Sequence, residues 1–217
     1  MGQRPQGWST HAVADRPLLH AFSHAGGGPD TFRRWPDAFR ACQIVPVRTE
    51  GAGTEHSSSV AQLARRWRRR TAQRSGVYYG HSLGALVAFE AAALAIAGRD
   101  LSQAPRAVVL GAPPAPGQDL AERLPARAGA AVASALDLVR RYQPSRKQLP
   151  LPVVVLWGEL DQLVREDEAR GWVQRGGTGS GWLRVPHAGH LFHLAPHASW
   201  VEPLQRVVMA PMPGART

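Results

Sequence analysis

This sequence predicts an α/β fold with a mostly parallel sheet. Short apolar runs alternate along the chain with stretches of helical character, which is the order expected of repeated βαβ units. The best of these runs are continuously apolar, which indicates strands that are covered on both faces. No internal repeat is present, and 217 residues suffice for one domain with a substantial core. We therefore expect a single domain over residues 1–217.

The apolar runs and the helical stretches define the expected elements in order. Strands are expected at Leu18–Ser23, Ile44–Val47, Val77–Gly80, Ala107–Gly111, Val153–Trp157 and Trp182–Val185. Helices are expected at Pro36–Ala41, Val60–Arg74, Leu83–Ala97, Asp167–Gln174 and Ser199–Met209. The domain core then covers about 18–112 and 150–209. Reactive groups in such folds gather beyond the carboxyl ends of the strands, so candidate functional residues are sought there.

One pentapeptide, residues 80–84, has the form G-x-S-x-G with Ser82 at its centre. In the nucleophile elbow of this form, a serine lies on a sharp turn from a strand to a helix. Gly80 and Gly84 lack a Cβ, so the strand and the helix can approach closely and expose the serine hydroxyl. The run before the motif is rich in β-formers, and the stretch after it has no proline before Gly98. This context predicts that Ser82 is a catalytic nucleophile.

The interval 113–149 interrupts the alternation of strands and helices. It opens on a proline-rich run, after which Val132, Leu136 and Val139 follow helical spacing and predict one amphipathic helix. This helix is either a short lid over the site or an ordinary crossover between two strands. The sequence leaves both interpretations open.

A serine nucleophile needs a base within hydrogen-bond reach, and the base needs a carboxylate that orients it. In hydrolases with a nucleophile elbow, these groups follow in the order Ser, acid, His. Asp161 comes directly after the strand expected at 153–157, and His190 comes after the strand expected at 182–185. We predict that His190 is the base and that Asp161 is the acid.

Other residues compete for both roles. The rival acids are Glu159 and Asp119, and the rival bases are His187, His193 and His197. Histidines this close together also suggest a metal site. No cysteine or H-E-x-x-H pattern joins them, so we expect no metal. His81 and His20 are expected to be packing or surface residues.

The developing oxyanion of an acyl-transfer reaction needs hydrogen-bond donors. The backbone N–H of Leu83 is one candidate, because it follows the nucleophile at the start of a helix. The glycine-rich segment 22–28 follows the first strand and supplies the second candidate, the N–H of Ala25. Such loops also bind phosphates, but no Gly-Lys-Ser/Thr sequence follows to support that alternative.

The chain is strongly basic, with a formal net charge of +10, and Lys147 is its only lysine. The densest cationic run is 65–70, which is expected to be a solvated helix face or a docking surface for an acidic protein. No groove-reading module accompanies it, so we expect no nucleic-acid function. We also expect no membrane span and no export signal. Cys42 is the only cysteine, so no internal disulfide can form, and the cytoplasm is the expected compartment.

Several motifs together resemble the type II thioesterases of polyketide and nonribosomal peptide biosynthesis, which belong to the α/β-hydrolase superfamily. The segment 22–27, Phe-Ser-His-Ala-Gly-Gly, is similar to the family's F-P-Y-A-G-G, and Phe32 and Trp35 follow it. The segment 80–90 closely matches the family's elbow and helix. Ala112-Pro113, Gly158 with Asp161, and the segment 189–192 fit as well. The resemblance covers about residues 18–204.

This resemblance implies an α/β-hydrolase fold and hydrolysis of acyl or aminoacyl thioesters on the phosphopantetheine arm of an acidic carrier protein. Ser82, His190 and Asp161 would form the triad, no cofactor would be needed, and we expect a monomer. The chain departs from the family at Ser23-His24, at 46–51 and in its shorter lid. An acyltransferase or chain-releasing enzyme with the same triad, or a small-ester carboxylesterase, remains an alternative.

Overall fold

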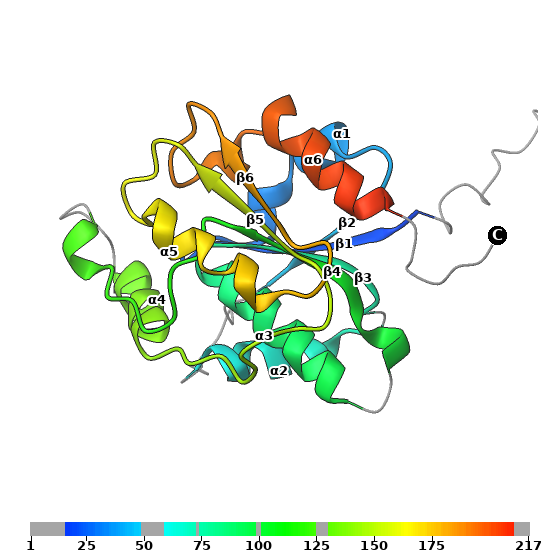
Figure 1. Ribbon diagram of the computed structural model, residues 1–217, viewed down its shortest axis with the longest axis horizontal. Coiled ribbons are helices and arrows are strands. Elements are labelled where there is room, and N and C mark those ends of the chain that lie inside the picture. Colours follow the sequence, from blue (N-terminus) through cyan, green and yellow to red (C-terminus); the bar gives the residue numbers. More distant parts are fainter. Residues whose placement is uncertain (1–15, 49–58, 73, 99–100, 125–129, 211–217) are drawn as a thin grey trace, which may run out of the picture.

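The computed structural model describes residues 16–48, 59–72, 74–98, 101–124 and 130–210. Six strands form one sheet in the order β2-β1-β3-β4-β5-β6, and every neighbouring pair is parallel (Figure 1). The strands are β1 (Leu18–Phe22), β2 (Gln43–Val47), β3 (Gly76–His81), β4 (Pro105–Gly111), β5 (Val153–Gly158) and β6 (Gly181–Val185). The parallel α/β fold predicted from the sequence is thus confirmed.

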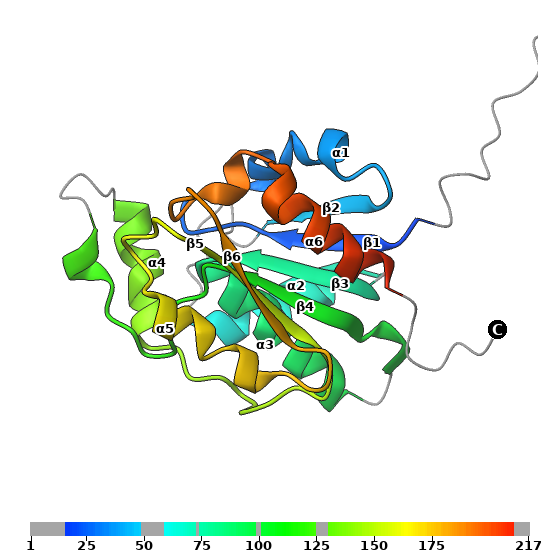
Figure 2. The same ribbon diagram turned by 45° about the horizontal axis from the view of Figure 1, so that its top comes forward.

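Helices cover both faces of the sheet (Figures 1 and 2). They are α1 (Trp35–Ala38), α2 (Val60–Arg70), α3 (Leu83–Ala97), α4 (Ala130–Arg140), α5 (Glu166–Arg170) and α6 (Ala198–Met209). Helices α2, α3 and α5 contribute to the apolar core on one face, while α1 and α6 contribute to the core on the other. No helix in the described ranges is both long and apolar enough to cross a membrane.

Three helices are shorter than the sequence predicts. Helix α1 ends at Ala38 because Phe39 leaves the helical region, with φ −112° and ψ 57°, and its ring stacks on Trp35 in the core. Helix α2 ends at Arg70 because Thr71 is extended. Helix α5 ends at Arg170, and a separate 3-10 turn, Val173–Arg175, follows it.

The register of the sheet brings the functional loops to one edge. Phe22, the last residue of β1, pairs with Gly80 near the end of β3, and Gly158 at the end of β5 pairs with Val185 at the end of β6. The loops that leave these strands therefore begin side by side. The segments after 22, 81, 158 and 185, which carry the predicted site residues, meet at this edge.

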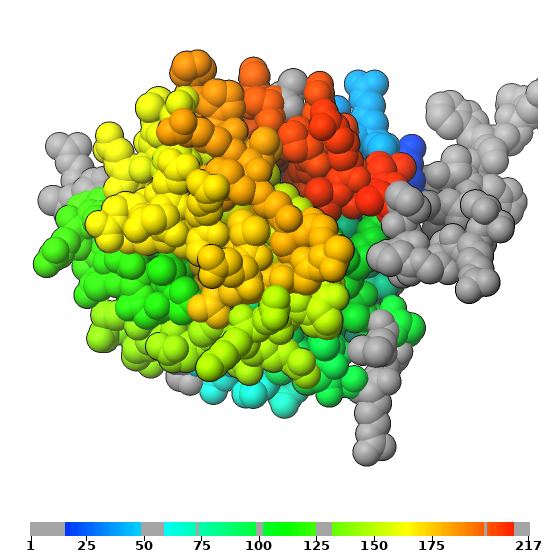
Figure 3. Space-filling view, in the orientation of Figure 1, coloured from blue at the N-terminus to red at the C-terminus, as the bar shows by residue number. Residues whose placement is uncertain are grey.

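The segment between β4 and β5 folds as a short 3-10 turn, Ala121–Arg123, and then helix α4. Glu90 of α3 anchors the end of this segment, because its Oε2 accepts hydrogen bonds from the Tyr142 hydroxyl at 3.3 Å and the Ser145 N–H at 3.1 Å. In the space-filling view, the green lid segment lies against the yellow α5 region (Figure 3). Leu124, Val132 and Leu136 from this segment line a cavity at the carboxyl edge of the sheet, which favours the lid interpretation over an ordinary crossover.

Candidate active site

Ser82 lies on the turn between β3 and α3, in a backbone conformation that non-glycine residues rarely adopt. Its φ is 54° and its ψ is −120°. The Ser82 N–H donates to the Gly111 carbonyl oxygen at 2.9 Å. This bond attaches the turn to the end of the neighbouring strand β4. A non-glycine residue held in a strained conformation is a feature of functional sites. The local geometry is therefore that of a nucleophile elbow.

The two glycines of the motif are required by close backbone contacts. A Cβ on Gly80 would collide with the Gly84 carbonyl oxygen, and a Cβ on Gly84 would collide with the carbonyl oxygens of Phe22 and Ser23. Helix α3 therefore lies directly against the ends of β1 and β3. This contact sets Ser82 next to the loop that follows β1.

His190 and Asp161 are joined by a hydrogen bond of 2.9 Å between Nδ1 and Oδ2. The Asp161 side chain is fully buried, and its Oδ1 accepts the N–H groups of Leu163 at 2.9 Å and Val164 at 3.0 Å. A carboxylate only accepts hydrogen bonds, so Nδ1 of His190 donates the proton in this bond, and in the neutral imidazole Nε2 is the acceptor. The arrangement provides a base whose orientation is fixed by a buried acid.

A cavity of about 500 Å³ contains both Ser82 and His190. Its remaining lining residues are His24, Ala25, Arg123, Leu124, Val132, Leu136, Leu160, Gln162, Leu163 and Leu191. Most of these side chains are aliphatic, and few polar groups face the serine. This is the composition of a pocket that holds an apolar ligand and orients it at a few polar points.

Of the two predicted oxyanion donors, Ala25 lines the same cavity, and Leu83 directly follows Ser82. Leu83 begins α3, and Ala25 lines the cavity from the loop after β1. Two hydrogen bonds fold that loop, from the Ser23 hydroxyl to the Gly27 carbonyl oxygen at 2.9 Å and from the Gly27 N–H to the His24 carbonyl oxygen at 3.0 Å. Among the described residues, the Ala25 N–H donates to no backbone carbonyl, as its predicted role as an oxyanion donor requires.

Of the five rival candidates, His193 is fully buried and contacts His24, and the other four lie away from the Ser82 cavity. Glu159 accepts the His187 N–H at 3.0 Å, and the His187 side chain is 91% exposed. Asp119 accepts the Ala121 N–H at 2.9 Å in the lid segment, and His197 begins α6 as its N-terminal cap. None of these side chains lines the cavity. No group of three or more His, Cys, Asp or Glu side chains in the described ranges could hold a metal ion.

His81, expected from the sequence to serve packing or to lie at the surface, is buried and links two parts of the site. Its Nε2 donates to the His190 carbonyl oxygen at 2.6 Å, and its Nδ1 accepts the Tyr79 hydroxyl at 2.9 Å. The elbow thus holds the backbone of the residue proposed as the base. The sequence did contain a signal for this contact: side chains alternate between the two faces of a strand, so Tyr79 and His81 lie on the same face.

Arg123 of the lid forms a clip to the loop that carries Asp161. Its guanidinium donates to both carboxylate oxygens of Glu168, at 2.8 and 2.9 Å, and to the Leu163 carbonyl oxygen at 3.1 Å. Leu163 therefore connects the two side chains: its carbonyl oxygen accepts from Arg123, and its N–H donates to Asp161. No sequence pattern marked Arg123, because its partners lie 40 and 45 residues away.

Burial keeps several histidines neutral and makes the stability sensitive to acid. Desolvation lowers the pKa of His20 and of His24 to about 4, and it lowers the pKa of His81 and of His193 well below the ordinary value. The unfolded chain binds protons at these residues below about pH 6.5, where the folded chain does not. The free energy of unfolding is therefore expected to fall as the pH decreases from about 6.5 toward 4.

Urea denaturation at about pH 7.5, 6 and 5 measures this effect. The His20→Phe variant is expected to show a weaker pH dependence than the native chain, because one neutral buried imidazole is gone. The His187→Gln variant removes an exposed imidazole and should keep the native slope. Equal unfolding free energies at about pH 7.5 and 5 would contradict the assignment of neutral buried histidines.

The elbow and the parallel sheet define an α/β-hydrolase. A family model for the thioesterase domain matches residues 17–169, which is more than half of the chain. The chain therefore belongs to the thioesterase family and is a hydrolase. No curated protein matches the sequence.

Solved structures of thioesterases share this fold. The type II thioesterase BorB from the borrelidin biosynthetic cluster is 21% identical with a TM-score of 0.71, over 90% of this chain and 92% of that chain. RedJ, a thioesterase from the prodiginine pathway of Streptomyces coelicolor, is 22% identical with a TM-score of 0.66, over 94% and 90% of the two chains. ClbQ from the colibactin pathway is 19% identical with a TM-score of 0.65, over 89% and 94%.

Proposed function

We propose that this protein is an editing thioesterase, which hydrolyses acyl or aminoacyl thioesters from the phosphopantetheine arm of a carrier protein in natural-product biosynthesis. The observation that carries the proposal is the elbow serine in one cavity with a His190–Asp161 pair, in a chain of the thioesterase family. The names of the similar structures support the choice of substrate, because BorB is a type II thioesterase of a biosynthetic cluster and ClbQ comes from a pathway of nonribosomal peptide and polyketide synthesis.

The reaction follows from the hydrogen bonds of the site. The Ser82 hydroxyl attacks the thioester carbonyl carbon while Nε2 of His190 takes its proton. The N–H groups of Leu83 and Ala25 stabilise the oxyanion. Collapse of the tetrahedral intermediate expels the thiol, to which His190 returns the proton, and leaves an acyl-serine. Water, activated by His190, then attacks the ester and releases the free acid, with Asp161 stabilising the imidazolium throughout. These steps use no cofactor.

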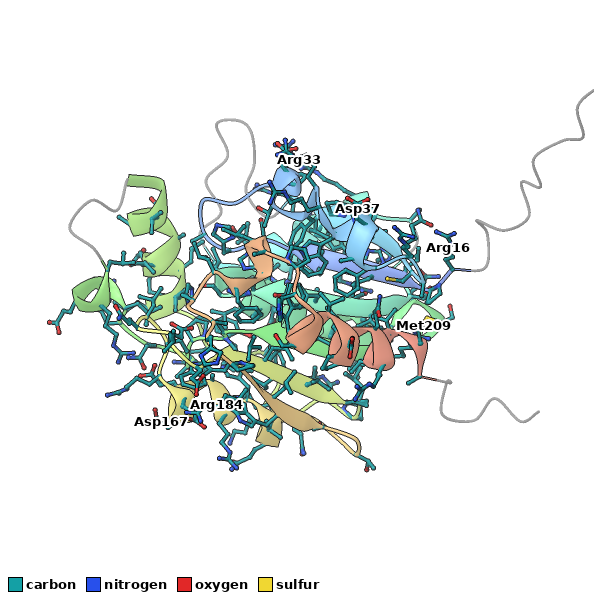
Figure 4. The ribbon with its side chains drawn as sticks, turned by 90° about the horizontal axis from the view of Figure 1, so that it is seen from above. Arg16, Arg33, Asp37, Asp167, Arg184 and Met209 are labelled. Carbon is teal, nitrogen blue, oxygen red and sulfur yellow. The ribbon has the colours of Figure 1, made fainter. Side chains whose placement is uncertain are left out.

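The charge of the chain supports an acidic partner. With a net charge of +10, the protein would attract an acidic carrier protein during encounter. Figure 4 shows Arg16, Arg33 and Arg184 at three separate places on the outline, so the basic side chains are not confined to one place. This distribution suits steering of the encounter more than a groove for nucleic acid. We propose that the protein acts as a monomer in the cytoplasm.

The direct test is mass spectrometry of a purified carrier protein that is loaded with acetyl or longer acyl groups and incubated with this protein. Release of free acids by the native chain, and not by the Ser82→Ala variant, is the expected result. Survival of the acyl-phosphopantetheine, together with cleavage of a small aryl ester, would instead favour a carboxylesterase. Transfer of the acyl group to an added amine or alcohol would favour an acyltransferase.

A further inference from the structure

A third imidazole, that of His24, lines the cavity beside Ser82 and His190. It has no role in the steps described above. His24 directly precedes Ala25, the proposed second oxyanion donor, and both residues line the cavity that contains Ser82. The other contributors to this cavity are largely aliphatic, which makes His24 one of its few polar points.

The His24 ring is held in place by two contacts. Its Nδ1 lies 3.0 Å from Nε2 of His193. The Nδ1–Cε1 edge also packs so closely over Gly27 that a Cβ there would lie 2.8 Å from Cε1 and 2.9 Å from Nδ1. Nε2 is bonded to Cε1 and makes no hydrogen bond to a described residue, so it is the ring nitrogen left for the cavity that His24 lines. The position of the ring is therefore set before any ligand binds.

The surroundings of His193 determine which nitrogens carry the protons. His193 is fully buried, its ring stacks on His81 with centroids 3.6 Å apart, and its Nδ1 has no hydrogen-bond partner among the described residues. A buried N–H without an acceptor is rarer in proteins than an acceptor without a donor. The proton of His193 therefore lies on Nε2, which donates to Nδ1 of His24.

This assignment fixes the state of His24 in turn. Burial, and secondarily the charge of His190, lower the pKa of His24 to about 4, so the ring is neutral near neutral pH. A neutral imidazole carries one N–H, and Nδ1 accepts the bond from His193. The remaining proton must lie on Nε2. His24 thus presents a fixed, uncharged N–H donor to the cavity.

We propose that His24 is a specificity-determining residue whose Nε2–H donates a hydrogen bond to an oxygen on the acyl group close to the thioester. This inference rests on the proposed thioesterase function and names the substrate class. The cavity then prefers acyl groups with a 3-oxo or 3-hydroxy group to saturated groups of the same length. The aliphatic side chains of the lid segment, among them Val132 and Leu136, would contact the remaining carbons of the acyl group.

The test compares two short thioesters, 3-oxobutyryl- and butyryl-N-acetylcysteamine, by kcat/KM. A neutral hydrogen bond predicts that the native protein prefers the oxygenated substrate by ~3–10-fold. The His24→Phe and His24→Met variants should bring this ratio close to unity, because both side chains lack an N–H donor. The His24→Gln variant retains an N–H donor near the position of Nε2 and should restore part of the preference.

Binding gives a second readout that does not depend on turnover. The corresponding non-cleavable amides should show the same ratio of Kd values with the native protein, and His24→Phe should abolish it. Equal ratios in the native and variant proteins would overturn the proposal. An equal loss of kcat for both substrates would also overturn it, because that pattern indicates stabilisation of the shared oxyanion. If the native protein cleaves neither thioester, the proposed function fails, and the amide Kd ratios alone decide the role of His24.

Discussion

The Ser82→Ala variant is expected to lose at least ~10³-fold in kcat for thioester hydrolysis, as serine triads do when the nucleophile is removed. The variant removes the only group on the elbow that can form the acyl-enzyme. Ser82 is 6% exposed and alanine fills less space, so the fold should persist. Steady-state kinetics with an acyl-N-acetylcysteamine substrate measures the loss, and circular dichroism verifies the fold.

Ser145→Ala is the matched control for this variant. Ser145 lies in the lid segment with an exposed side chain, and its backbone N–H, which binds Glu90, is retained in the variant. Its kcat should remain within about twofold of the native value, as for a surface substitution. Retention of a tenth or more of the native activity by Ser82→Ala would refute the acyl-serine route.

The second large effect is expected for Asp161→Asn, with a loss of about 10⁴-fold in kcat, the size seen when the acid of another serine triad is replaced by its amide. Asparagine retains the shape and an oxygen that can accept the N–H groups of Leu163 and Val164. Its NH₂ group then faces His190 and donates to Nδ1. The imidazole proton moves to Nε2, and the base loses the lone pair that Ser82 needs.

Asp119→Asn separates this interpretation from its rival. Asp119 lies in the lid segment, where its carboxylate accepts the Ala121 N–H, and an asparagine oxygen can do the same. We expect near-native kcat for this variant. A large loss of kcat for Asp119→Asn combined with a small loss for Asp161→Asn would assign the role of the acid to Asp119, which follows β4.

The elbow could be predicted from the sequence because its geometry is local. Only glycine fits at positions 80 and 84, and the strand and helix on either side have clear patterns. His190 and Asp161 could be placed because parallel strands end at one edge of the sheet. The choice between them and their rivals depended on loop conformation, since Glu159 is only two residues from Asp161 and turns instead toward His187 and Arg184.

Contacts between distant segments could not be predicted. The lid and the crossover were equally compatible with the spacing of Val132, Leu136 and Val139, and the cavity lining favours the lid. The pairing of His24 with His193 joins residues 169 positions apart. The end of α1 at Ala38 likewise depends on the burial of Phe39 against Trp35 and Trp200.

The contacts of Arg123 couple the position of the lid segment to that of Asp161, the proposed catalytic acid. A ligand that lifts the 121–124 turn must stretch the bond to the Leu163 carbonyl oxygen and uncover the carboxylate of Glu168, whose side chain is 5% exposed. The same peptide segment would then hold Asp161 less firmly. Under the proposed function, a bulky acyl group would be disfavoured for two reasons: it needs more space, and admitting it would loosen the contacts that hold Asp161.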